Sequence, residues 1–139
     1  MKEANFALAP GGVHRAKSIM RARLSKDFTF EAAQTLPNVP PEHPCGKMHG
    51  HSFKVEIVVE GDVDPHMGWV YDHSRISRAM EPLIDILDHA YLNEIEGLQN
   101  PTIENTAAWI WKRLEGSLPG LCEIIIHETP IARCIYRGE

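Results

Sequence analysis

Two stretches near the start of the chain alternate between apolar and polar residues as a half-buried β-strand does. Residues 22–33 place Phe28, Phe30 and Ala32 on one side, and residues 49–61 repeat the pattern over a longer run. One side of this second stretch carries His49, His51, Phe53, Val55, Ile57 and Val59. The alternation predicts two strands, with both histidines at the head of the core-facing row. Between them, the proline-rich segment "LPNVPPEHPCG" predicts an irregular loop.

The second half of the chain changes to helical spacing and then returns to strands. An apolar residue every three or four positions predicts a helix through Ile76, Ala79, Met80, Leu83, Ile86 and Leu87. We expect Pro82 to kink or split it. Thr102 suits the N-cap of a second helix that runs to Leu114. The segments "LCEIIIHET" and "IARCIYR" predict two closing strands.

The resulting element order is ββααββ, which defines an α+β domain. We expect a four-stranded antiparallel sheet with two helices on one face. Residues 1–21 are interpreted as an N-terminal tail, and residues 22–139 as a single domain. Because four strands leave the sheet edges open, we also expect a homo-oligomer.

Composition and charge exclude some classes of function. The chain has 139 residues, 14 basic and 19 acidic side chains, and a net charge of −5. It lacks a basic stripe interleaved with aromatic residues, so nucleic acid is not an expected partner. No apolar run approaches the roughly 20 residues that span a bilayer, so a membrane is not expected either. Three cysteines without an export signal favour reduced thiols in the cytoplasm.

His49 and His51 are the first candidate metal ligands. Two residues apart on one strand, they project the same way at about 6.6–6.8 Å along the backbone, so both imidazoles can reach one ion. A catalytic zinc site usually has three protein ligands, and strand alternation places Gln34 beside the two histidines. An amide oxygen is a poorer zinc ligand than an imidazole, which predicts a weakened or lost ligand position. Other histidines that could substitute are His43, His66, His73 and His14.

Four further residues are candidates for chemistry. Cys45 stands in a C-x3-H-x-H pattern and is either a zinc ligand or a base or nucleophile held near the metal. In the pair Asp88–His89, the carboxylate can polarise the imidazole for proton transfer. Glu128 follows the apolar row of a strand and is either paired structurally or suited to a bidentate grip on the N–H edge of a pterin or guanine.

Taken together, these motifs resemble the 6-pyruvoyltetrahydropterin synthase superfamily, and more closely its bacterial queuosine-pathway branch, the 6-carboxytetrahydropterin synthases. The resemblance covers about residues 26–139. It is carried by "KDFTFEAA", "CGKMHGHSF", "DPHMGWVYD", "LDHAYLN", "NPTIENTAAWIW", "HET" and "CIYRGE". The short spacing between Cys45 and His49 is similar to that branch.

The resemblance implies a T-fold whose monomers join into a barrel-forming trimer, with two trimers stacked as a hexamer and active sites between subunits. It also implies conversion of 7,8-dihydroneopterin triphosphate to 6-carboxy-5,6,7,8-tetrahydropterin, acetaldehyde and triphosphate. The resemblance also implies a role for each matching residue of this chain. His49 and His51 would bind Zn²⁺, Cys45 would abstract a proton, Asp88 and His89 would form a catalytic relay, and Glu128 would bind the pterin.

Two positions depart from the pattern of this family. Relatives normally carry a histidine, the third zinc ligand, where this chain has Gln34, and close relatives often carry a histidine at the position of Ala90. Two alternatives to the carboxytetrahydropterin synthase follow. One is a 6-pyruvoyltetrahydropterin synthase-like or other pterin side-chain lyase. The other is a pterin- or purine-binding oligomer whose catalysis is impaired at Gln34.

Overall fold

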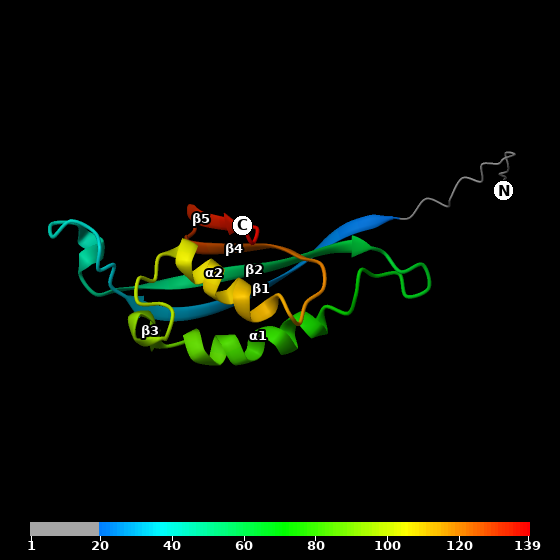
Figure 1. The fold of residues 1–139 in the computed structure, drawn as a ribbon, viewed down its shortest axis with the longest axis horizontal. Helices are drawn as coiled ribbons and strands as arrows, with labels where there is room; N and C mark the ends of the chain where they lie inside the picture. The colour runs from blue at the N-terminus through cyan, green and yellow to red at the C-terminus, as the bar shows by residue number, and fades with distance from the viewer. Residues whose placement is uncertain (1–19) are drawn as a thin grey trace, which may run out of the picture.

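The computed structural model describes residues 20–139 (Figure 1). Most of the predicted tail of residues 1–21, namely residues 1–19, lies outside the described residues. The end of the predicted tail is different, because Arg21 already belongs to the first strand. The main elements in chain order are β1 (Arg21–Gln34), β2 (His49–Asp62), α1 (Ser74–Leu87), β3 (Ala90–Tyr91), α2 (Ile103–Leu114), β4 (Leu121–Thr129) and β5 (Ala132–Tyr136). Two short 3-10 turns, η1 (Pro44–Gly46) and η2 (Leu92–Glu94), precede β2 and follow β3.

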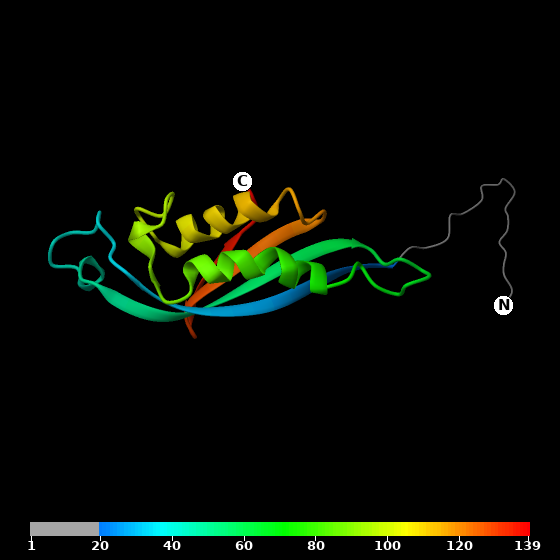
Figure 2. The ribbon, with the colours of Figure 1, turned by 90° about the horizontal axis from the view of Figure 1, so that it is seen from below.

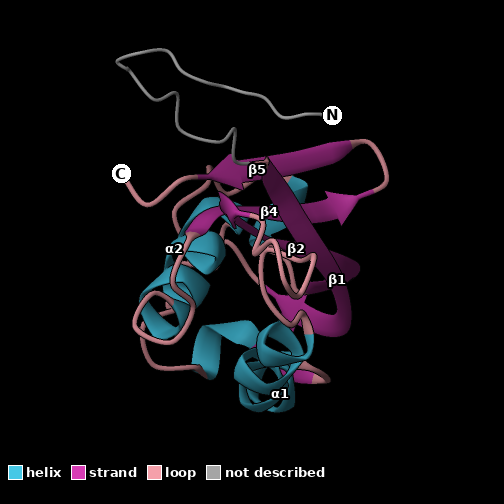
Figure 3. Cartoon of the chain, turned by 90° about the vertical axis from the view of Figure 1, so that its right-hand side faces the viewer, coloured by secondary structure: helices cyan, strands magenta, loops and turns pink. Residues whose placement is uncertain are grey.

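The elements form two layers, a sheet and a pair of helices on one of its faces (Figures 2 and 3). The sheet order is β3-β1-β2-β4-β5. Alternate residues of β2 form the buried row, and this row packs against apolar side chains of α1 and α2 because burial of both faces removes apolar surface from water. The residues at the centre of this core include Phe53, Val55, Ile57, Ile76, Met80, Ile110 and Leu114.

The alternation in the first two strands is confirmed, and it fixes where the histidines lie. β1 and β2 pair antiparallel from Arg21 opposite Asp62 to Gln34 opposite His49. In Figures 1 and 2 the end of this strand pair next to the proline-rich loop extends beyond the helical layer. Gln34 and the two histidines therefore stand at one end of the core-facing row, where the apolar core gives way to polar side chains.

The expected four-stranded antiparallel sheet is wrong in one respect, because the described residues form five strands. β3 is short and pairs in parallel with β1, placing Ala90 beside Ala32 and Tyr91 beside Ala33. The turn that makes this possible is at His89, which adopts a φ of 60°, a left-handed conformation that few residues other than glycine take up. β3 was not predicted because a strand of two residues is too short to show an alternation of apolar and polar residues.

The two helices are short, with 14 residues in α1 and 12 in α2. Within residues 20–139, no helix is both long and apolar enough to cross a membrane. Pro82 lies inside α1, which is one helix from Ser74 to Leu87, so the expected split of this helix is wrong. Thr102 caps α2 as predicted, because its hydroxyl accepts a hydrogen bond from the Asn105 backbone N–H at 3.1 Å.

Candidate active site

The imidazoles of His49 and His51 lie side by side at the end of the core-facing row. Their ring centroids are 4.9 Å apart and the rings are nearly perpendicular. Nδ1 of His49 lies 2.7 Å from the Lys47 carbonyl oxygen. Since a carbonyl only accepts, Nδ1 carries the proton and Nε2 of His49 carries the lone pair. This is the tautomer that a metal ligand requires, with a backbone carbonyl orienting the ring.

Gln34 faces these imidazoles from the opposing strand. Its side chain is fully buried, and its Nε2 lies 3.5 Å from Nε2 of His49. The strand segment beyond it is held by Asn93, which donates from Nδ2 to the Thr35 carbonyl oxygen at 2.7 Å and accepts the Thr35 N–H at 2.9 Å. Gln34 is thus a fixed part of the site wall, as the strand alternation predicted.

Two polar atoms at this point are buried without a hydrogen-bond partner. They are Gln34 Oε1 and His51 Nε2, and within residues 20–139 the only other such side-chain atom is the Tyr71 hydroxyl oxygen. A buried polar group left unpaired costs free energy, and the two unpartnered atoms beside His49 Nε2 fit a bound cation. Rotation of the Gln34 amide about its last bond would turn Oε1 toward His49.

These atoms fit a metal ion as two imidazoles and one amide oxygen. Over residues 20–139, no three His, Cys, Asp or Glu side chains are grouped so that they could hold a metal. Among the other histidines within residues 20–139, His43, His66 and His73 are not grouped with His49 and His51. His43 Nδ1 accepts a backbone N–H in the loop, His73 Nδ1 lies 3.0 Å from Lys26 Nζ at the N-terminus of α1, and His14 lies outside the described residues.

Glu128 lies directly beside the same pair of imidazoles. Its Oε2 is 3.5 Å from His51 Nε2, within ion-pair range but not a hydrogen bond, and the two side chains are 25% and 19% exposed. It follows Ile124 and Ile126 on the helix-facing side of β4, as predicted. A half-buried carboxylate at the mouth of the site is available to a ligand with N–H donors.

Cys45 lies in the loop that connects β1 to β2. The side chain is half-buried, in the 3-10 turn η1. The carbonyl oxygen of Cys45 accepts the Leu36 N–H at 2.8 Å, which closes the base of the loop. Cys122 and Cys134 are half-buried strand residues, and burial raises the pKa of each thiol above its ordinary value. Of the three cysteines, Cys45 alone lies on the loop that leads into the histidine strand.

Asp88 and His89 form a hydrogen-bonded pair that is fastened to β1. Asp88 Oδ2 lies 2.9 Å from His89 Nδ1, and Asp88 Oδ1 accepts the Glu31 N–H at 2.9 Å. The His89 N–H donates to the Glu31 carbonyl oxygen. The Glu31 N–H, followed by His89, lowers the pKa of Asp88 below its ordinary value. The carboxylate therefore stays ionised and holds the His89 ring with Nε2 outward.

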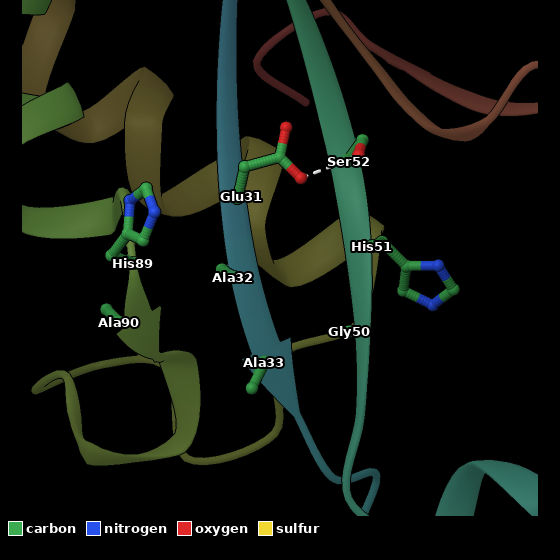
Figure 4. Close-up of a pocket in the computed structure, with 8 residues that line it drawn as sticks. All are labelled: Glu31, Ala32, Ala33, Gly50, His51, Ser52, His89 and Ala90. Carbon is green, nitrogen blue, oxygen red and sulfur yellow. Dashed lines mark hydrogen bonds between the residues drawn. The ribbon is translucent and has the colours of Figure 1, made fainter.

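Within one copy of the chain, His51 and His89 line the same pocket, but their side chains do not converge (Figure 4). Figure 4 shows His89 on one flank of the β1–β2 strand pair and His51 projecting from the other. This pocket has a volume of about 410 Å³ and is also lined by Glu31 and Ser52. Ser52 donates to Glu31 Oε1 at 2.6 Å. The sequence analysis missed these two residues, which alternate onto the polar side of their strands and carry no motif of their own.

The pKa of Asp88 gives a test of this clamp. A carboxylate whose folded pKa is depressed stabilises the fold above its ordinary pKa, 3.8, and loses that contribution as the pH falls through the lower folded value. We expect Asp88→Asn to be less stable than the native protein at pH 7, and the difference to shrink as the pH is lowered below 3.8. Urea unfolding across pH measures it, with Asp85→Asn at an exposed position of α1 as the control. A difference that is constant with pH would contradict the clamp.

The chain is thus an α+β sheet whose polar end carries His49 and His51, with Cys45 on the loop that leads into His49. The family model for 6-pyruvoyl tetrahydropterin synthase matches residues 23–139, and the chain belongs to this family. Among the solved structures, that of 6-pyruvoyl tetrahydropterin synthase from Caenorhabditis elegans superposes with a TM-score of 0.80 at 25% identity. That comparison covers 87% of this chain and 98% of the other.

Curated relatives carry more than one name. A 6-carboxy-5,6,7,8-tetrahydropterin synthase from Synechocystis sp. is 41% identical over 117 residues, which is 80% of this chain and 89% of the relative. A dihydroneopterin monophosphate aldolase from Pyrococcus furiosus is 37% identical over 101 residues, 73% of this chain and 82% of the relative. The family of the chain is therefore established. Its curated relatives are named after different reactions on pterins.

Proposed function

We propose that the protein is a 6-carboxy-5,6,7,8-tetrahydropterin synthase of queuosine biosynthesis in the cytoplasm. It would convert 7,8-dihydroneopterin triphosphate to the carboxytetrahydropterin, acetaldehyde and triphosphate. The observation that carries the proposal is the grouping of His49, His51 and Glu128 at one end of the core-facing row. The relative from Synechocystis sp. that bears this name supports it.

We further propose that the site holds Zn²⁺ through His49 and His51, with Gln34 as a weak third ligand. A bound zinc ion would polarise oxygen atoms of the substrate side chain and acidify the neighbouring protons. The unpartnered Gln34 Oε1 and His51 Nε2 support this assignment. Binding through an amide oxygen in place of an imidazole lowers the affinity for zinc, because the amide is a neutral and harder ligand.

The chain's own residues would divide the remaining work. The Glu128 carboxylate would accept two N–H bonds from the pterin ring and so orient the side chain of the substrate toward the imidazoles. The Cys45 thiolate would take a proton from that side chain. His89, held by Asp88 through Nδ1, would move a proton at its outward Nε2.

The separation of His89 from His51 within one copy supports a site built from two copies of the chain. In the part of the chain that the structure describes, both sheet edges offer unpaired backbone, because β3 covers only residues 32–33 of β1 and β5 ends the sheet on the other side. We propose that copies join through these edges into a barrel and assemble as a hexamer, so that His89 of one copy serves the zinc site of another.

A second candidate is a different cleavage of a dihydroneopterin side chain, favoured by the identity to the monophosphate aldolase of Pyrococcus furiosus. Four basic residues that could bind a triphosphate by charge, Lys26, Lys47, Lys54 and Arg133, are dispersed. Lys26 contacts His73 on the helical side, whereas Arg133 donates toward His127 at 3.4 Å on the opposite face of the sheet. A single strong triphosphate site is thus not formed by these four residues in one copy.

The test is to incubate the zinc-loaded protein with 7,8-dihydroneopterin triphosphate and identify the products by mass spectrometry. We expect acetaldehyde and 6-carboxytetrahydropterin, and we expect their loss in Cys45→Ala. Another aldehyde, or turnover of the monophosphate alone, would favour the second candidate. Binding of the pterin that depends on Glu128, with no product at any zinc concentration, would establish instead a binding protein without catalysis.

A further inference from the structure

His43 lies two residues before Cys45 and contacts it directly. Nδ1 of His43 accepts the backbone N–H of Cys45 at 3.0 Å. The acceptor role requires the lone pair on Nδ1, so the ring proton is on Nε2. His43 is exposed, and it is not part of the group formed by His49, His51 and Gln34.

This contact completes the hydrogen bonding of the turn that carries the thiol. Pro44 is the first residue of η1 and has no N–H, the Gly46 N–H donates to the His43 carbonyl oxygen at 3.0 Å, and the Lys47 N–H donates to that of Pro44 at 3.1 Å. The Cys45 N–H is therefore the one donor of the turn left for a side chain. His43 takes the role that Asp, Asn or Ser usually takes at the start of a helical turn.

The Cys45 backbone is fixed on both sides as a result. Its N–H is held by His43, and its carbonyl oxygen accepts the Leu36 N–H at the base of the loop. A base that abstracts a proton must be held at a definite distance from its substrate, and a displacement of about 1 Å can reduce the rate by about a hundredfold. Within residues 20–139, the residues of η1 other than Cys45 are exposed, so side-chain packing restrains this turn little.

We propose that His43 is a positioning residue for Cys45: its imidazole Nδ1 holds the turn that fixes the thiol, and it acts through this hydrogen bond and not on the substrate. The catalytic consequence of this contact rests on the proposed function, whereas the restraint on the thiol does not. The sequence analysis named His43 as a possible third metal ligand. The proposal gives it a different role, outside the metal site.

Two substitutions separate the hydrogen bond from the rest of the side chain. His43→Ala removes the acceptor. His43→Asn keeps one, because an asparagine side-chain oxygen accepts the N–H two residues further on in an Asx turn. His66→Ala is the matched control, since His66 is also an exposed loop histidine and lies outside the proposed site. Thermal unfolding of each variant establishes that the fold is intact.

The first measurement is the rate at which iodoacetamide alkylates Cys45 in the absence of substrate, followed by mass spectrometry of the peptides that contain each cysteine. We expect severalfold faster alkylation of Cys45 in His43→Ala, native rates in His43→Asn and His66→Ala, and unchanged rates at Cys122 and Cys134. The second measurement is turnover of the pterin triphosphate. We expect kcat to fall by about ten- to a hundredfold in His43→Ala, with little change in KM, and to recover in His43→Asn.

The outcomes distinguish this proposal from the proposed function. Native alkylation of Cys45 in His43→Ala would overturn it, and so would an equal effect of the Ala and Asn substitutions, which would show that the acceptor is not what matters. If the native protein forms no acetaldehyde but the alkylation rates follow the expected pattern, the positioning role stands and the proposed function fails.

Discussion

Gln34→His is expected to raise the affinity for Zn²⁺ by about a hundredfold or more. Residues that only orient a metal ligand change the affinity by about 10–100-fold when altered, and a direct ligand should have at least this effect. Gln34 stands opposite His49 in the strand register and is fully buried. A histidine at this position would present a third imidazole to the ion. The measurement is a competition titration with a zinc chelator of known affinity.

Gln34→Leu is the matched control for this substitution. It has a similar volume and no ligand atom, so it distinguishes a weak amide ligand from a site of two histidines only. If Gln34 binds zinc through Oε1, Gln34→Leu lowers the affinity below that of the native protein. If the native protein and Gln34→Leu bind zinc equally, Gln34 is not a ligand, and an unchanged affinity in Gln34→His would remove the zinc site from the proposal altogether.

The sequence correctly placed Gln34 beside the two histidines because a single strand pair builds this end of the sheet. Side chains alternate strictly along a strand, so placing His49 and His51 on the core-facing row also placed position 34 beside them. The register confirms this pairing. Glu128 was predicted on the helix-facing side of its strand for the same reason, although its 3.5 Å approach to His51 depends on β2 and β4 being neighbours.

What the sequence did not predict depends on contacts between distant segments. β3 exists because the left-handed turn at His89 lays two residues along β1, and the Asp88 carboxylate is held by a backbone N–H 57 positions away. Pro82 was expected to kink or split α1 because it lacks an N–H, yet one helix continues past it to Leu87. Pro82 lies on the exposed face of α1, and the opposite face is buried against the core. The packing of that buried face stabilises the helix by more than the one hydrogen bond lost at Pro82 costs.

The placement of His89 leads to the second large prediction, that two inactive variants restore activity to each other. His49→Ala and His89→Ala should each lower kcat by about a hundred- to ten-thousandfold, since the first removes a proposed zinc ligand and the second a proposed proton-transfer group. If each site takes His49 from one copy and His89 from another, then after the two variants are unfolded and refolded together about a quarter of the sites contain both residues.

The control for this experiment is a mixture of His49→Ala with His51→Ala. These two histidines lie 4.9 Å apart on one strand, so every site in that mixture lacks one of them and no activity should return. Native mass spectrometry shows whether mixed oligomers form in both cases. Mixed oligomers of His49→Ala and His89→Ala that stay inactive would mean that both residues act within one copy. The β1–β2 strand pair that separates His89 from His51 in Figure 4 would then have to rearrange before catalysis, which its 14 consecutive residue pairs oppose.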